Sequence, residues 1–171
     1  IGRKLYYELM ARGYGVGITR LHDYALSDDS PFKSLYSRHL RDLKQREYIA
    51  KVVKPKIFIS IHANHSSISS IRGPLVIHQN TAESYLFAQL LQESLNECAQ
   101  ITKKAYPSRR YYLLNSIKTP ALITEVGYIS HYGERKKLFD VSYQEQLVKA
   151  IADAIDHYFL IYYPSSLIQS K

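Results

Sequence analysis

The stretch 57–61 constrains the fold of this chain more than any other feature. Its sequence, Ile-Phe-Ile-Ser-Ile, is almost continuously apolar and β-branched. Such a run is typical of a strand buried on both faces, as in a parallel sheet covered by helices. Residues 121–124 (Ala-Leu-Ile-Thr) have the same character. We therefore expect a three-layer α/β sandwich, in which helices flank both faces of a mostly parallel, twisted sheet.

The rest of the chain alternates between helical and strand patterns. The spacing of apolar residues predicts helices over residues 1–12, 35–53 and 81–98, and a long last helix from Ser142, where Ser-Tyr-Gln-Glu has the form of a capping box. Short apolar segments predict further strands over residues 15–19, 74–78 and 111–114. A chain of 171 residues fits one domain. We place that domain at residues 1–163, with a C-terminal tail over 164–171.

The composition limits the classes of partner. A net charge of +8 favours an anionic partner such as nucleic acid, anionic lipid or a cell-wall polymer. The basic residues are scattered and no nucleic-acid-binding motif is present, so we expect no nucleic acid partner. No apolar run approaches the length of a membrane span. The chain shows no signal peptide and does not begin with methionine, from which we expect a segment to be missing before Ile1.

The single cysteine, Cys98, excludes an internal disulfide and a cysteine-based zinc site. It falls on the apolar stripe of a predicted helix, which favours a buried, inert thiol over a nucleophile.

Two predicted strands end in residues that carry chemistry. Residues 57–61 lead into His62, and residues 121–124 lead into Glu125. In open α/β sheets, ligands bind outside the carboxyl ends of the strands, so parallel strands bring both side chains to one edge. A neutral imidazole held by a strand is a good metal ligand, although a hydrogen-bonded structural histidine fits the same position. Asn64, two residues further on, points the same way and is a candidate to hold a ligand or a substrate carbonyl.

Glu125 lies in apolar surroundings, between Leu-Ile-Thr and Val-Gly. A carboxylate there needs a partner, or burial raises its pKa. A raised pKa suits a general acid or base near neutral pH, and we favour this role over a salt bridge to a residue such as Arg135. For Arg20 and Asp23 we favour a loop-organising ion pair, and for Arg46 a solvated or bracing charge.

These residues resemble a known family, the zinc-dependent N-acetylmuramoyl-L-alanine amidases of cell separation, wall turnover and spore germination. The resemblance covers residues 3–162. Four elements carry it in order and spacing: Thr-Arg-x-x-Asp at 19–23, Arg-x-x-x-Ala at 46–50, Phe-Ile-Ser-Ile-His-Ala-Asn at 58–64 and Pro-Ala-Leu-Ile-Thr-Glu-Val-Gly-Tyr-Ile-Ser at 120–130. The last two of these elements, at 58–64 and 120–130, are together a strong signal of the family.

The resemblance implies a zinc ion held by two histidines and a glutamate, with peptidoglycan as the partner and a periplasmic, cell-envelope or secreted location. His62 matches one histidine ligand, and Glu125 matches the acid/base glutamate. The other two ligands belong to family segments that this sequence lacks, and we expect them upstream of Ile1. The chain as written is then expected to be inactive and to bind zinc weakly.

The implied reaction is metal-assisted hydrolysis of the amide between N-acetylmuramic acid and L-alanine. Zinc lowers the pKa of a bound water from about 15.7 towards 7. Glu125 would take that water's proton and return it to the departing amine. The alternative is a degenerate, non-catalytic homologue that binds or scaffolds peptidoglycan. Another kind of α/β hydrolase is disfavoured, because the sequence has no Gly-x-Ser-x-Gly elbow and no glycine-rich phosphate loop.

This chain departs from the family pattern at two positions, where it has Lys51 and His131 in place of asparagine; polar contacts can survive both changes. Some relatives carry a regulatory helix that blocks the zinc after the Ser-x-His-x-Asn element. Only about ten residues follow Asn64 before the next predicted strand, which is too short for such a helix. We therefore predict that no helix from this loop covers His62.

Overall fold

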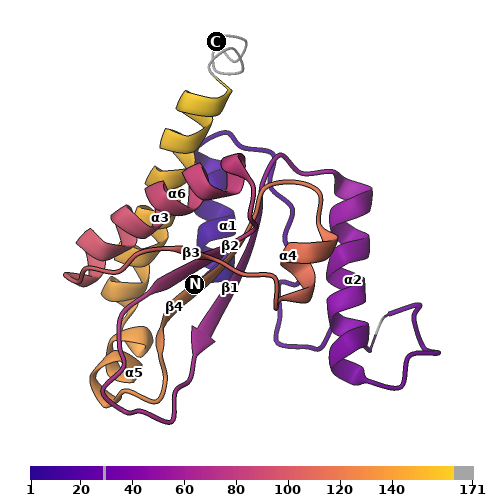
Figure 1. Cartoon of the computed structure of the whole chain (residues 1–171), viewed down its shortest axis with the longest axis horizontal. Helices are drawn as coiled ribbons and strands as arrows, with labels where there is room; N and C mark the ends of the chain where they lie inside the picture. Colours follow the sequence, from indigo (N-terminus) through magenta and orange to yellow (C-terminus); the bar gives the residue numbers. More distant parts are fainter. Residues whose placement is uncertain (29, 164–171) are drawn as a thin grey trace.

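The computed structural model describes residues 1–28 and 30–163 (Figure 1). In this part of the chain, four strands form one sheet in the order β1-β4-β2-β3. The strands are β1 (Phe58–Asn64), β2 (Leu75–His78), β3 (Tyr106–Pro107) and β4 (Ala121–Tyr128). β1 runs parallel to β4, and β3 runs parallel to β2, whereas β2 and β4 are antiparallel. The sheet is therefore mixed, but the two strands that contain His62 and Glu125, β1 and β4, are parallel to each other.

Helices cover both faces of this sheet, as the sequence predicts (Figure 1). They are α1 (Gly2–Ala11), α2 (Arg38–Val53), α3 (Ala82–Ala99), α4 (Tyr112–Ser116), α5 (Tyr132–Phe139) and α6 (Val141–Tyr162). One apolar core joins α1, α3 and α6 to the sheet, and a second, smaller core joins α2 and α4 to its other face. The α/β sandwich is confirmed. Of the described helices, none is long and apolar enough to cross a membrane.

Strand β4 lies between the two cores and alternates between them. Leu122 and Val126 pack in the core of α1, α3 and α6, whereas Ala121 and Ile123 pack in the core of α2 and α4. Because side chains alternate along a strand, Glu125 points to the same side as Ile123. The candidate acid/base therefore lies on the face that α2 and α4 cover.

Two predicted strands are wrong. Residues 15–19 form a connection that pairs with no described strand, and the two glycines there disfavour a strand. Residues 111–114 begin helix α4, in which Leu113 and Leu114 are buried. A short apolar run does not distinguish a strand from a buried helical turn by periodicity, and here the packing against β4 selects the helix.

The start of the last helix also differs from the prediction. Asp140 caps α6, because its carboxylate accepts a hydrogen bond from the Tyr143 backbone N–H at 3.0 Å. The predicted capping box at Ser142 therefore does not begin this helix. Helix α5 was not predicted; it has no buried residue, so it lacks the apolar stripe that reveals a helix in a sequence. The predicted tail at 164–171 lies outside the described residues.

Candidate active site

His62 and Glu125 are direct neighbours across two parallel strands. In the register of β1 with β4, His62 pairs with Glu125. Adjacent strands are about 4.8 Å apart, and paired residues point to the same face of the sheet. The structure thus brings the two predicted residues together on the side of the sheet covered by α2 and α4. Both strands continue beyond the predicted ends, so the two residues lie within the sheet rather than just after it.

Glu125 is a buried carboxyl group that makes no ion pair with any described residue. Only 8% of the residue is exposed, and its Oε2 atom is buried without a hydrogen-bond partner. Burial raises the pKa of Glu125 above its ordinary value. The salt bridge to Arg135 that we considered does not form, since Arg135 donates to the Ile129 carbonyl at 3.4 Å instead. This environment is typical of a general acid/base.

His62 is exposed, and one of its ring nitrogens is engaged. Nε2 lies 2.7 Å from the Ser60 hydroxyl, two residues earlier on the same strand. Partial burial lowers the pKa of His62, Arg46 lowers it further, and Asp42 opposes this shift. The lowered pKa favours the neutral imidazole, the form in which histidine binds a metal. Since Ser60 occupies Nε2, Nδ1 is the nitrogen available to a ligand.

Two arginines near the site form ion pairs, of which the Arg20–Asp23 pair was predicted, whereas Arg46 was predicted to be a solvated or bracing charge. Arg46 on α2 donates from Nε to Asp42 at 2.7 Å and reaches the Thr19 hydroxyl at 3.4 Å. It thereby braces α2 against the connection that contains Thr19. Arg20 lies 3.9 Å from Asp23 in an exposed loop. Both arrangements match the structural roles that the sequence favours.

Asn64 joins the loops that follow the two strands. Its side-chain oxygen accepts a hydrogen bond from the His65 N–H at 2.7 Å, and its backbone oxygen accepts one from the Ile129 N–H at 2.8 Å. Asn64 follows His62 by two positions on β1, so it lies on the same face as His62, and it pairs with Tyr128 in the register. No contact here tests its predicted role in substrate binding, which stays a prediction.

The residues described here contain no complete set of metal ligands. No group of three or more histidine, cysteine or carboxylate side chains is positioned to hold a metal ion in residues 1–28 and 30–163. His62 fits the chemistry of one zinc ligand, because its lowered pKa favours the neutral ring and because it is exposed and held by a strand. His78 is buried beside the Tyr85 ring of α3, and His131 caps α5 by accepting from the Glu134 N–H at 3.2 Å.

The two departures from the family pattern have structural roles. His131 is the cap of α5, the position at which asparagine is a good cap as well. Lys51 forms an ion pair with Glu47 at 2.6 Å. Glu47 also contacts Lys44 at 3.3 Å and the Tyr112 hydroxyl of α4. Glu47 thus links α2 to α4. The sequence does not predict this role, because Glu47 is one of many charged residues in this helix.

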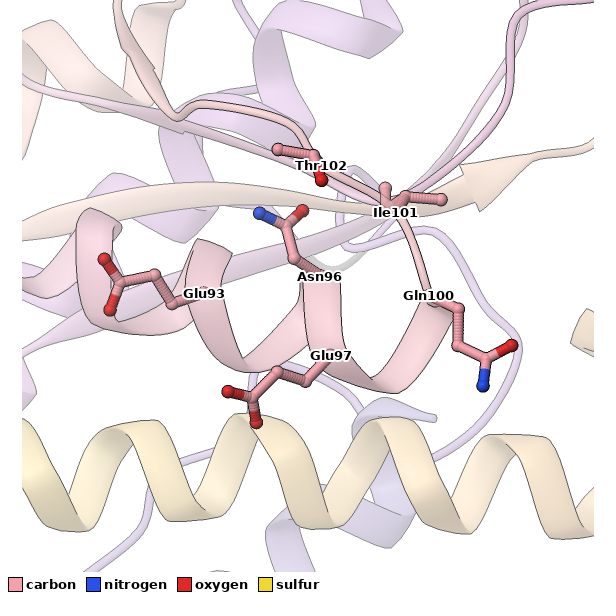
Figure 2. Close-up of a pocket in the computed structure, with 6 residues that line it drawn as sticks. All are labelled: Glu93, Asn96, Glu97, Gln100, Ile101 and Thr102. Atoms are coloured by element: carbon pink, nitrogen blue, oxygen red, sulfur yellow. The ribbon is translucent and has the colours of Figure 1, made fainter.

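The loop between β1 and β2 contains no helix. The prediction that no helix of this loop covers His62 is therefore confirmed. A depression of the described surface with a volume of about 360 Å³ lies elsewhere, at the end of α3 (Figure 2). Figure 2 shows its lining side chains, which are Glu93, Asn96, Glu97, Gln100, Ile101 and Thr102. Neither His62 nor Glu125 lines it.

The chain is similar to a class of amidases that includes a probable cell wall amidase of Staphylococcus epidermidis. The family described as N-acetylmuramoyl-L-alanine amidase matches residues 1–157. The chain therefore belongs to the N-acetylmuramoyl-L-alanine amidase family.

Individual relatives agree with this assignment. The chain is 28% identical over 153 residues to the germination-specific N-acetylmuramoyl-L-alanine amidase of Bacillus subtilis, covering 88% of the chain and 64% of the relative. It is 26% identical over 133 residues to the uncharacterized protein YqiI of the same organism, covering 76% of the chain and 64% of that protein. The chain thus spans just under two thirds of these two relatives.

The fold matches that of a solved amidase. The structure of the CwlD amidase from Clostridioides difficile, in complex with the GerS lipoprotein, superposes with a TM-score of 0.86 at 27% identity. This match covers 92% of the chain and 82% of the CwlD chain.

Proposed function

We propose that this chain is the greater part of a domain that hydrolyses the amide bond between N-acetylmuramic acid and L-alanine in peptidoglycan. The observation that carries the proposal is the direct pairing of His62 with Glu125 on parallel strands. The unpaired, buried carboxyl of Glu125 supports a proton-transfer role, and the membership of the family supports the substrate. The location that follows is the cell envelope, in the periplasm or outside the cell.

In this proposal Glu125 moves the proton and His62 is a zinc ligand. Glu125 accepts a proton from the attacking water and later gives it to the departing L-alanine amine. A bound zinc ion would polarise the amide carbonyl and lower the pKa of the water. His62 would contribute one ligand, through Nδ1, while Ser60 holds the other ring nitrogen. The proposal assigns the remaining ligands, a histidine and a glutamate, to residues that precede Ile1.

One alternative function has an observation in its favour. Because no set of three metal-binding side chains exists among the residues that the structure describes, a non-catalytic peptidoglycan-binding homologue also fits. The two proposals differ in a simple way. A non-catalytic protein has no use for an unpaired buried carboxyl group, which costs free energy of folding.

The test is release of peptide from purified sacculi by the full-length protein, with and without zinc. We expect zinc-dependent release, and a loss of about 100-fold or more in Glu125→Gln, since a positioned acid/base contributes about that much. The metal content of this variant should equal that of the wild type. His62→Ala should lose both metal and activity. Glu97→Gln, an exposed site on α3, is the matched control for the substitution.

Two results would contradict the proposal. A Glu125→Gln variant that works at the wild-type rate removes Glu125 from the reaction. A full-length protein that binds sacculi but releases no peptide at any zinc concentration supports the non-catalytic alternative.

A further inference from the structure

A β-bulge changes the direction of one side chain beside the candidate active site. The register pairs His62 with Glu125 and then Asn64 with Tyr128, so two steps on β1 correspond to three on β4. Strand β4 therefore carries one extra residue, which breaks its alternation. Strict alternation would place Tyr128 on the opposite face from Glu125. With the bulge, Tyr128 returns to the face of Glu125 and His62.

The residues inside the bulge confirm this geometry. Val126 packs in the core of α1, α3 and α6. A Cβ at Gly127 would lie 3.4 Å from Leu138 and 3.4 Å from Glu134, both on α5. Both bulge positions thus face away from Glu125. Gly127 has φ +157°, a conformation that residues with a side chain rarely adopt.

Glu134 and Lys103 hold Tyr128 in place. Glu134 accepts hydrogen bonds from the backbone N–H groups of Tyr128 at 2.8 Å and of Gly73 at 2.6 Å. Lys103 donates to the Gly73 carbonyl at 2.9 Å, and its ammonium lies 4.9 Å from the centre of the Tyr128 ring. A charge placed over an aromatic face stabilises the ring position. Glu134 thereby holds the Tyr128 backbone, and Lys103 contacts its ring.

The phenol groups of Tyr128 and Tyr106 lie near the Glu125 carboxylate. Burial raises the pKa of Tyr128, and Glu125 raises it further. Burial also raises the pKa of Tyr106 to about 12, with contributions from Tyr111, Tyr128 and Glu125. Tyr106 pairs with Ile77 of β2, and Ile77 pairs with Ile123, so Tyr106 is on the face of Glu125. These hydroxyls therefore remain protonated, and each is a neutral hydrogen-bond donor.

We propose that Tyr128, re-aimed by the bulge and fixed by Glu134 and Lys103, positions the substrate over His62 and Glu125 by donating a hydrogen bond to one of its amide carbonyl oxygens. This inference rests on the proposed amidase function. The Tyr128 hydroxyl makes no hydrogen bond with another described side chain, so it is available to a ligand. Tyr128 and Glu125 are equally buried, at 7% and 8% exposure; Glu125 pairs with the exposed His62, and Tyr128 pairs with Asn64, two residues further along β1. An amide substrate offers the carbonyl oxygens that such a donor needs.

The test compares Tyr128→Phe with wild type in the full-length protein, using muramyl dipeptide for binding and sacculi for turnover. Phenylalanine keeps the ring under Lys103 and removes only the hydroxyl. Loss of one hydrogen bond should raise the Kd measured by calorimetry, and the KM, by about 3- to 10-fold. We expect a much smaller change in kcat and an unchanged unfolding midpoint. Tyr132→Phe, at an exposed tyrosine of α5, is the matched control and should change none of these values.

A second variant tests the support of the ring. Lys103→Met keeps the aliphatic stem and removes the charge, so it should also weaken binding. Its effect should be smaller in the Tyr128→Phe background than in wild type, since both changes act through one side chain.

The outcomes separate the two proposals. If the wild type binds and cleaves while Tyr128→Phe has the same Kd and KM within twofold, the inference about Tyr128 is wrong and the amidase function stands. If the wild type neither binds the dipeptide nor cleaves sacculi, both are wrong. If Tyr128→Phe lowers both kcat and the unfolding midpoint while its Kd is unchanged, Tyr128 has a structural role only.

Discussion

The two faces of strand β4 differ in what they contribute. On one face, β4 packs with α1, α3 and α6 in a core whose large side chains, such as Leu91, Leu95 and Ile151, are completely buried. On the other face, the core with α2 and α4 is smaller and borders the polar residues Ser60 and Glu125. Apolar burial stabilises a fold, whereas a buried carboxyl without a partner opposes it. The comparison indicates that the first face holds the fold together and the second holds the chemistry.

The largest effect on stability should come from the first face. Leu91→Ala removes a fully buried side chain of α3 and leaves a cavity, so we expect the free energy of unfolding to fall by about 2–5 kcal/mol. Urea unfolding followed by circular dichroism measures this change. Leu160→Ala, at an exposed leucine of α6, should change stability by less than about 0.5 kcal/mol. Similar losses for the two variants would contradict the assignment of the core.

Glu47 tests whether polar groups on the second face also stabilise it. Burial alone would raise its pKa, but hydrogen bonds from Lys51, Tyr112 and Lys44 outweigh this and lower the pKa of Glu47 to about 2. A carboxyl with a lowered pKa stabilises the folded state when ionised. Glu47→Gln should therefore cost about 1–3 kcal/mol at pH 7.

The pH dependence gives this prediction its sign. The stabilisation by Glu47 should be complete above its unfolded pKa of 4.5 and should disappear as the pH falls towards 2. Unfolding of wild type and Glu47→Gln between pH 7 and pH 2 should thus give converging curves. Glu97→Gln, at an exposed glutamate, should follow the wild type throughout. A constant difference at all pH values would show that the ion pairs are not responsible.

A substitution of Gly127 tests whether the bulge in β4 requires a glycine. Gly127→Ala places a Cβ at φ +157° and 3.4 Å from Glu134 and Leu138, so we expect a loss of about 1 kcal/mol in stability. Gly15→Ala is the control, because its Cβ would meet nothing within 4 Å and its φ is ordinary. Thermal unfolding of the two variants makes the comparison. A Gly127→Ala variant as stable as wild type would show that the bulge tolerates a side chain.

An effect of similar size should have the opposite sign. Glu125→Gln removes a buried charge without a partner, so the variant should be more stable than wild type at pH 7, by roughly 1 kcal/mol. Because burial raises the pKa of Glu125, the wild type should regain stability as the pH falls through that raised value. The advantage of the variant should then shrink. A Glu125→Gln variant that is less stable at pH 7 would mean that the carboxylate has a stabilising partner.

Much of the site could be predicted because it depends on strands with strong patterns. Residues 57–61 and 121–124 identify β1 and β4, and parallel pairing is enough to bring His62 and Glu125 together. The pattern at 111–114 predicts a strand where α4 forms, since a short apolar segment takes the structure that its packing selects. The bulge, and with it the placement of Tyr128, depends on contacts of Gly127 and Tyr128 with α5, an element without apolar periodicity.

The most direct test of this account is anomalous diffraction at the zinc edge from crystals of the full-length protein. The account predicts one strong peak about 2.0–2.1 Å from a ring nitrogen of His62, the usual zinc–histidine distance, with the Glu125 carboxylate beside it. A metal bound elsewhere, with His62 still bonded only to Ser60, would contradict the assignment of His62 and Glu125 to a common active site.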